Sequence, residues 1–234
     1  MFGGQKTAQL EQEETHWLSV SDLMAGLMMV FLFISIALMR NAFIERDKIK
    51  QVAVAYQENQ IAIYDALTTE FDSDLEKWNA EIDEDSLTFT FKSPDVLFKT
   101  GSYDLKPEYQ ELLNEFFPRY LKVLDPFKES INEVRIEGHT SSYWGSYSKD
   151  DAYFKNMALS QDRTRSVLQY IYSLPPVSQH KDWIKSHLAA VGLSSSKLIY
   201  ASNGLEDRQA SRRVSFRVIT NADIQIKSIL QDTL

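Results

Sequence analysis

Cysteine is absent from this chain of 234 residues. Without cysteine the protein has no disulfide framework, no thiol nucleophile and no lipid-modified cysteine anchor. The four histidines show no spacing typical of a zinc site, and the serine clusters lack the base and acid partners of a catalytic triad. The sequence therefore predicts no metal, no organic cofactor and no enzyme activity.

An excess of basic residues is also lacking. The chain carries 25 Lys and Arg against 33 Asp and Glu, which gives a formal net charge of −8. Proteins that bind nucleic acid need clustered positive charge to neutralise phosphates. We therefore expect no nucleic-acid partner.

The sequence contains only one long hydrophobic run. Residues 17–39 read WLSVSDLMAGLMMVFLFISIALM and contain a single charged side chain. Because roughly 20 apolar residues span the hydrocarbon core of a bilayer, we predict a transmembrane helix over residues 16–40. The run is longer than the apolar part of a cleaved signal peptide, and no small-residue cleavage site follows it. This favours an anchor that stays in the membrane.

Asp22 is the single charge in that run. A carboxylate there costs ~2.5–3.5 kcal/mol on insertion scales, so such residues usually face a protein partner or an ion path. Helical spacing places the small residues Ser19, Ala25 and Gly26 on the same face, where they allow close helix contacts. We predict that Asp22 faces a protein partner or an ion path and that the Ser19 hydroxyl hydrogen-bonds its carboxyl group. The alternative, an interfacial Asp at a frayed helix start, is disfavoured because Trp17 already marks the interface.

The charges that flank the run favour a cytoplasmic C-terminal domain. Lys6 is the only basic residue before the run, whereas four follow it closely, namely Arg40, Arg46, Lys48 and Lys50. Positive charge favours the cytoplasmic side of a membrane. This local signal conflicts with the orientation implied by a family resemblance given below.

The rest of the chain predicts a neck and one folded domain. Residues 1–15 are polar and form the expected N-terminal tail, and residues 41–85 show helical spacing of apolar side chains, which predicts a helical neck that can pair in a dimer. Residues 86–220 alternate strands and helices, and an amphipathic tail, residues 221–234, closes the chain.

We predict an α+β fold for residues 86–220, an α/β sandwich in which helices flank one sheet. Strands are expected at SLTFTFKS, NEVRIEGHT, KLIYAS and RRVSFRVI. Helices are expected up to Leu124 after Pro107, from Met157 to Leu174, and from about Asp182 to Ala190.

Motifs in this domain resemble, in order, the OmpA-like peptidoglycan-binding domain. They are VLF-x-x-G, IEGHT, N-x-x-LS-x-x-R, an Asn-Gly pair and SRRVSF. The resemblance implies a cleft for the peptidoglycan stem peptide, including diaminopimelate, between the loop after IEGHT and the Arg-bearing helix. The binding residues expected on this basis are Thr140, Ser141, Asn156, Leu159 and Arg163.

Residue chemistry supports such a cleft independently. Asn156, Leu159 and Arg163 share one helix face. A guanidinium fork binds a carboxylate with two hydrogen bonds, and Asn156, expected near the helix start, offers a donor and an acceptor beside backbone N–H groups that favour anions. In the alternative interpretation, Asn156 caps the helix and Arg163 forms a solvated ion pair.

One position departs from the family pattern. The family usually has Asp directly after GHT, where it holds the amino group of diaminopimelate, but this chain has Ser141. Asp150 or Asp151 is a candidate substitute. The affinity for the stem peptide, or the choice of ligand, is therefore open.

Other conspicuous residues near these motifs have structural interpretations. Tyr143, Trp144 and Tyr147 either stack on sugar rings or, as we favour, form an adaptable clamp. His139 is expected to close the strand-to-loop turn. For Arg212 and Arg213 we favour ion pairs that fix the last strand over ligand contact, and Glu137 and Arg135 are expected to take part in a cross-strand pair.

The membrane helix and the domain together resemble MotB-type stator subunits. The pattern W-x-S-x-x-D-L-M with the following FLFI, and the opening MFG, are similar to the MotB-like subunits of Zorya anti-phage defence, the ZorB family. The resemblance implies that Asp22, with Ser19 beside it, binds and releases protons or sodium ions between the span and a ring of partner helices. We favour a proton, because one Ser beside one Asp forms no sodium-specific cage. It also implies an inner-membrane homodimer inside a pentameric, multi-span MotA-like (ZorA-type) subunit. The N-terminus would be cytoplasmic, and the periplasmic domain would grip peptidoglycan.

Three further functions compete with a defence stator. A flagellar stator subunit would share the same parts. A passive tether between membrane and cell wall would leave Asp22 without a role. A wall hydrolase is the least favoured, because the sequence shows no paired catalytic carboxylates or metal site.

Overall fold

A computed structural model describes residues 4–92, 97–99 and 101–221, with side chains described from Val20 onward. The chain forms two compact units, Met1–Val52 and Ala53–Leu234, and each is described by itself. Helix α1 (Gly4–Leu75) supplies the first unit and the opening of the second. The predicted tail 221–234 lies outside the described residues except for Asn221.

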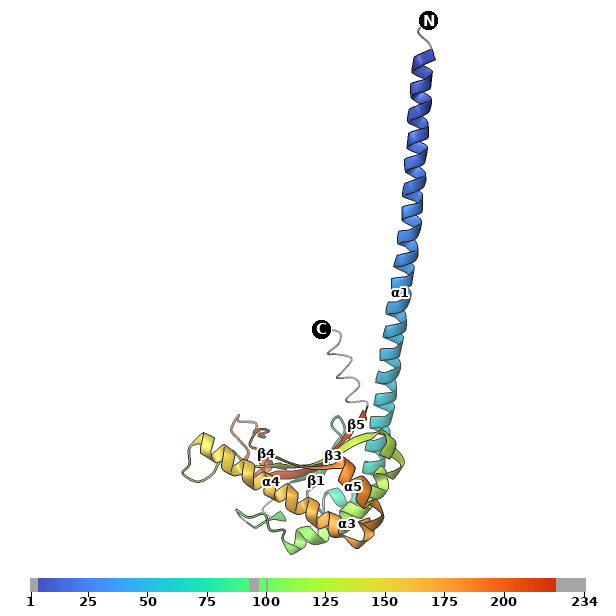
Figure 1. Cartoon of the computed structure of the whole chain (residues 1–234). Helices are drawn as coiled ribbons and strands as arrows, with labels where there is room; N and C mark the ends of the chain where they lie inside the picture. The colour runs from blue at the N-terminus through green and yellow to red at the C-terminus, as the bar shows by residue number, and fades with distance from the viewer. Residues whose placement is uncertain (1–3, 93–96, 100, 222–234) are drawn as a thin grey trace. The chain divides into compact units, whose positions relative to one another are not determined.

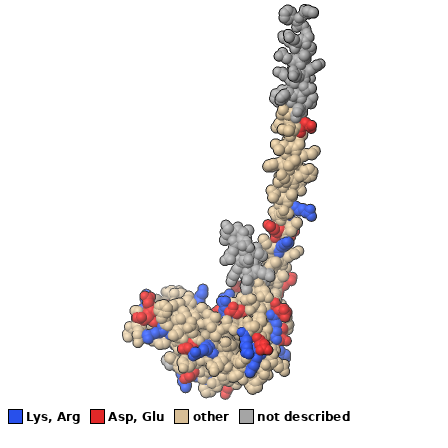
Figure 2. Space-filling model, in the orientation of Figure 1, with Lys and Arg blue, Asp and Glu red and all other residues tan. Residues whose placement is uncertain are grey.

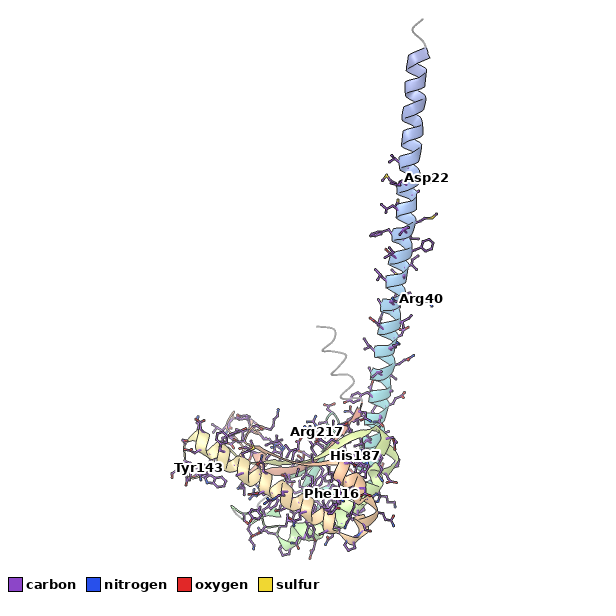
Figure 3. All side chains as sticks on the ribbon, viewed as in Figure 1. Asp22, Arg40, Phe116, Tyr143, His187 and Arg217 are labelled. Carbon is purple, nitrogen blue, oxygen red and sulfur yellow. The ribbon has the colours of Figure 1, made fainter. Side chains whose placement is uncertain are left out.

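The first unit consists of α1 as far as Val52. Its described side chains are exposed up to Gln51, and between Asp22 and Arg40 none of them is charged. Figure 2 shows this stretch as uniformly uncharged, and Figure 3 labels the two residues that bound it. Among the described residues, α1 is the one helix long and apolar enough to cross a membrane. Since α1 begins at Gly4, the segment predicted as a polar tail is helical over its described part.

The second unit is built on a five-stranded sheet in the order β1-β2-β5-β3-β4. Its strands are β1 (Ala80–Asp83), β2 (Thr88–Lys92), β3 (Ile131–His139), β4 (Leu188–Ser194) and β5 (Arg213–Thr220). Neighbours run antiparallel except β3 and β4, which are parallel and joined through a helical crossover. The mixed sheet with helices agrees with the predicted α+β class.

Three helices lie on one face of this sheet (Figure 1). They are α3 (Pro107–Leu124), α4 (Lys149–Ser173) and α5 (Lys181–His187), with the short helices η1 (Asp125–Ser130), η2 (Pro175–His180) and α6 (Arg208–Ser211) at the connections. Apolar side chains alternate along β5, where Val214, Phe216 and Val218 are buried under the helices. The opposite face of β5 carries the polar side chains Arg213, Ser215 and Arg217, followed by Ile219.

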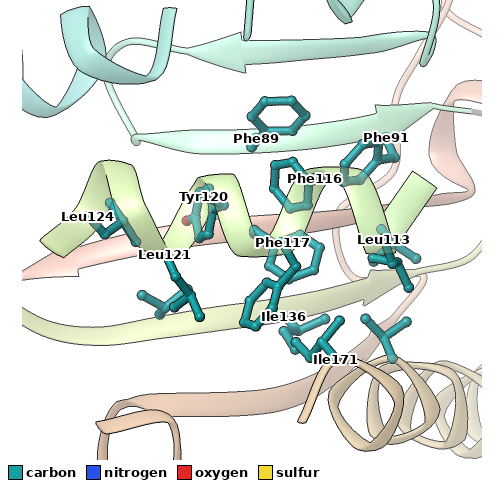
Figure 4. Close-up of a cluster of buried hydrophobic side chains, with 14 of the residues drawn as sticks. Phe89, Phe91, Leu113, Phe116, Phe117, Tyr120, Leu121, Leu124, Ile136 and Ile171 are labelled. Carbon is teal, nitrogen blue, oxygen red and sulfur yellow. The ribbon is translucent and has the colours of Figure 1, made fainter. Parts of the chain in front are cut away.

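Phe116 of α3 lies at the centre of the core (Figure 4). Its ring centroid is 4.7–5.3 Å from those of Phe71, Phe89, Phe91, Tyr120 and Phe216, all fully or almost fully buried. Aromatic pairs at such separations contribute beyond their buried area. This cluster therefore joins the end of α1, two strands and α3.

Two glycines allow α4 to lie close to the sheet. A Cβ on Gly138 of β3 would lie 2.8 Å from the carbonyl oxygen of Ser160, and a Cβ on Gly192 of β4 would collide with the backbone of Gln161. The Ser160 hydroxyl accepts a hydrogen bond from the backbone N–H of Ser194 at 3.1 Å. These contacts fix the position of α4 along both strands.

Three details of the secondary structure differ from the sequence-based expectations. KLIYAS is not a strand, apart from one bridge between Tyr200 and Glu206, because LAAVGLS (Leu188–Ser194) pairs with β3 instead. Helix α4 begins at Lys149 and not at Met157, since Ser148 caps it. The predicted helical neck, residues 41–85, is helical only as far as Leu75, because Ala80–Asp83 form β1, whose Glu81 forms an ion pair with Lys92.

Replacing Phe116 with Ala should lower the free energy of unfolding of the α+β domain by about 3–5 kcal/mol, because a large cavity would form among rigid neighbours. Urea unfolding of the detergent-solubilised protein, followed by near-ultraviolet circular dichroism, measures this change. Phe154→Ala is the matched control, since Phe154 is 70% exposed and its loss should cost less than about 0.5 kcal/mol. Equal unfolding midpoints for the two variants would contradict the assigned core.

Candidate functional site

A cleft of about 240 Å³ lies beside α4 in the second unit. It is lined by Gly101, Thr140, Ser141, Tyr143, Trp144, Gly145, Asn156, Leu159, Arg163 and Arg212. All five residues predicted to bind the stem peptide are therefore brought together around one space.

Arg163 is held in place by contacts on two sides. Its Nε donates a hydrogen bond to the carbonyl oxygen of Ser102 at 2.9 Å, and its guanidinium lies 4.8 Å from the ring centroid of Phe98. The side chain is 8% exposed. This burial contradicts the solvated side chain of the alternative interpretation. A fixed, nearly buried guanidinium is preorganised to bind an anion.

Asn156 and Thr140 face the cleft from different elements. The Asn156 side-chain amide donates a hydrogen bond to the carbonyl oxygen of Ser141 at 3.1 Å, which joins α4 to the loop after β3. Thr140 is 3% exposed, and within the described part of the chain its hydroxyl has no hydrogen-bond partner. A buried, unsatisfied hydroxyl is costly, so a polar ligand group at this point would stabilise it.

Two expectations about these residues are wrong. Asn156 is not near the start of its helix, because α4 begins at Lys149, and neither capping nor exposed backbone N–H groups are available to it there. Asp150 and Asp151 do not line the cleft; Asp151 instead accepts a hydrogen bond from Ser148 in the first turn of α4. They do not replace the carboxylate that the family pattern has at position 141.

Arg212 also lines the cleft, which the sequence-based interpretation did not favour. Its Nε donates to the carbonyl oxygen of Arg208 at 3.0 Å. Arg213, its neighbour, points to the other face and donates to the carbonyl oxygens of Lys197 and Ser211. The paired arginines thus have different roles, because Arg212 caps α6 and lines the cleft whereas Arg213 begins β5. Arg163 and Arg212 thus each contribute a guanidinium group to the described lining of the cleft.

His139 and Glu137 form a buried pair on the sheet face away from the helices. His139 Nε2 lies 3.5 Å from Glu137 Oε2, whereas Arg135 pairs with Glu133 and not with Glu137. Burial lowers the pKa of His139, and the contact with Glu137 offsets this only in part. Burial alone would raise the pKa of Glu137, but the hydrogen bond from His139 and nearby arginines hold it below its usual value. His139 is therefore structural, as expected from the sequence.

Asp22 lies on α1 in the first unit and is exposed in the isolated chain. The side chain of Ser19 lies outside the described residues, so its predicted hydrogen bond to Asp22 stays a prediction. Ser35, further along the same helix, donates its hydroxyl to the carbonyl oxygen of Phe31 at 2.8 Å. Among the described residues, no group of His, Cys, Asp and Glu could hold a metal ion.

Comparisons with known proteins agree with this arrangement. A family model described as the OmpA family matches residues 97–213. The "Zorya protein ZorB" of Escherichia coli (strain Crooks) is 56% identical over 230 residues, which is 98% of each chain. The chain belongs to the ZorB family. This ZorB-family chain is not an enzyme, since neither the ZorB family nor the OmpA family consists of enzymes.

Solved structures similar to this ZorB-family chain include two bacterial domains. A putative MotB-like protein from Desulfovibrio vulgaris is 21% identical with a TM-score of 0.49, and the match covers 69% of this chain and 91% of the other. The cell wall anchor of the T6SS from Pseudomonas aeruginosa is 20% identical with a TM-score of 0.46, covering 66% and 97%.

The stability of the α+β domain should fall as the pH decreases from 7 to 4. The pKa of His139 is lower in the folded protein than its usual value of 6.5, so below about pH 6.5 the unfolded chain takes up a proton that the folded state resists. The contribution of Glu137 is present above its usual value of 4.5 and is lost as the pH falls through the lower folded value.

Unfolding midpoints measured at several pH values test this dependence. His139→Asn should flatten the dependence between pH 7 and 5, whatever its effect on absolute stability. His187→Gln is the control, because His187 stacks on Trp183 at the surface of α5 and takes no part in the pair. An unchanged slope for His139→Asn would show that His139 is not the group responsible.

Proposed function

We propose that this chain is an ion-conducting, peptidoglycan-anchored stator-type subunit of an inner-membrane motor that acts in Zorya anti-phage defence. The observation that carries the proposal is that one ZorB-family chain combines a candidate membrane helix with an OmpA-family domain. The apolar stretch of α1, residues 17–39, carries one acid, Asp22, and an OmpA-family domain follows α1.

Asp22 is the proposed ion-binding group. The described side chains on its helix face, Ala25, Gly26 and Met29, are small or apolar and offer no other charge. A carboxyl group removed from water favours its neutral form, so Asp22 can take up a proton when sealed and release it when open. A single carboxyl group is enough to carry a proton, which is why we propose a proton in preference to a sodium ion.

A homodimer inside a pentameric MotA-like subunit is the proposed assembly. One membrane helix cannot enclose an ion path, so Asp22 needs a second, multi-span protein. Moving one charge across 100 mV releases ~2.3 kcal/mol, which can bias the stepping of partner helices past Asp22. In this arrangement the N-terminus is cytoplasmic, against the local charge signal, and the α+β domain is periplasmic.

The cleft beside α4 is the proposed wall-binding site. The guanidinium groups of Arg163 and Arg212 in its lining have the geometry to bind the carboxylates of a peptidoglycan stem peptide. Wall attachment would hold the dimer still, so that ion flow turns the ring and not the dimer. The two sites therefore serve one mechanism although they lie in different units of the chain.

Asp22→Asn should abolish phage protection while leaving membrane levels and partner co-purification unchanged, because the amide keeps the shape but cannot exchange a proton. Plaquing efficiency on cells that carry the intact operon measures protection. Ser35→Ala is the control, since the Ser35 hydroxyl bonds within its own helix. Full protection by Asp22→Asn would leave only a passive tether.

Arg163→Ala should reduce retention of the protein on purified peptidoglycan at least about tenfold, the loss expected for a charge-assisted bidentate contact. Arg163→Lys keeps the charge but lacks the planar fork and should be intermediate. Arg165→Ala is the control on the same helix, because Arg165 is exposed and contacts Asp162. Equal retention of all three variants would remove Arg163 from the wall-binding site.

A further inference from the structure

Exposed aromatic side chains border the cleft on the loop after β3. Tyr143 and Trp144 line the cleft, and Tyr143 and Tyr147 are each 54% exposed. Figure 3 shows Tyr143 near the start of α4, away from the core residue Phe116. Exposed aromatic rings grouped beside a pocket are typical of a ligand-binding surface.

Hydrogen bonds at both ends hold this loop. The backbone N–H of Ser142 donates to Glu206 Oε1 at 2.8 Å, and the Ser142 hydroxyl donates to the other oxygen of the same carboxylate. At the far end, the Ser148 hydroxyl caps α4 by accepting from the Asp151 N–H at 3.2 Å. Between them, the Tyr147 N–H donates to the Trp144 carbonyl oxygen at 3.2 Å and closes a turn.

Two cationic side chains from outside the loop pack against the rings of Tyr143 and Tyr147. The Arg208 guanidinium lies 4.5 Å from the ring centroid of Tyr143, and the Lys155 ammonium lies 4.3 Å from that of Tyr147. Each cation covers one face of its ring. The rings are therefore presented in fixed positions, which argues against the adaptable clamp favoured from the sequence and for a preformed surface.

We propose that Tyr143 and Trp144, supported by Tyr147, bind a sugar ring of the glycan strand that carries the stem peptide. This inference rests on the proposed wall-binding function of the cleft. An aromatic face carries negative charge density, so it attracts the polarised C–H face of a pyranose. The cleft thus offers fixed guanidinium groups for the acidic peptide and a neutral aromatic surface for the sugar next to it.

Two soluble wall fragments distinguish the peptide contact from the sugar contact. Binding of the full-length, detergent-solubilised protein is measured to the free stem peptide and to the same peptide attached to its N-acetylated disaccharide. The wild type should bind the disaccharide fragment about threefold to tenfold more tightly, the range expected for aromatic stacking. Tyr143→Ala and Trp144→Ala should remove this difference by lowering the affinity for the disaccharide fragment more than the affinity for the free peptide.

Matched variants test whether stacking is responsible. Tyr143→Phe keeps the ring and should keep the sugar-dependent gain. Phe154→Ala removes an exposed aromatic on the opposite side of α4 from Asn156, Leu159 and Arg163, and should bind both fragments as the wild type does.

Three results would overturn the inference. Equal wild-type affinities for the two fragments would reject the sugar contact while leaving the peptide site intact. If Tyr143→Ala and Trp144→Ala lower the affinity for both fragments equally, the loop contacts the peptide as a clamp and not the sugar. Failure of the wild type to bind either fragment would reject the proposed wall-binding function, and the sugar contact with it.

Discussion

Burial of the end of α1 inside the α+β domain is the interaction on which the rest of the structure depends. Ile63, Leu67 and Phe71 are fully buried, and Phe71 packs directly against Phe116 of α3. Arg119 of α3 adds hydrogen bonds to Glu70 at 2.6 Å and Asp74 at 2.8 Å. The last turns of α1 cannot therefore rotate or slide without breaking the core. A helix that carries the candidate ion site thus ends as a structural part of the candidate wall-binding domain.

The cleft depends on the same core through α4. Gly138 and Gly192 permit the close approach of α4 to the sheet, and this sets where Asn156 and Arg163 meet the loop after β3. A side chain at either glycine would move α4 and with it the guanidinium in the cleft. Contacts between α4 and the sheet, and then the aromatic cluster, therefore connect the cleft to the end of α1.

The sequence predicted the periodic elements well and the local chemistry less well. Strand alternation around Phe89 and Phe91, and the helical spacing of Asn156, Leu159 and Arg163, depend on short-range rules that a sequence displays directly. The strand LAAVGLS was missed because its small side chains fit under α4, which only the tertiary contact at Gly192 reveals. The role of Arg212 was missed because its neighbour Arg213 has the same chemistry but points to the other face of the sheet. The Ser142–Glu206 contact joins residues 64 positions apart and has no local signal.

Ion flux through the assembled complex tests the central claim most directly. The chain would be purified with its multi-span partner and reconstituted into liposomes that contain a pH-sensitive dye and no cell wall. The account predicts that an imposed membrane potential drives proton influx in the wild type and equally in Arg163→Ala, and that Asp22→Asn abolishes it. Influx that persists with Asp22→Asn, or a wild-type complex that conducts no ion, would contradict the assignment of Asp22 as the ion site of a stator.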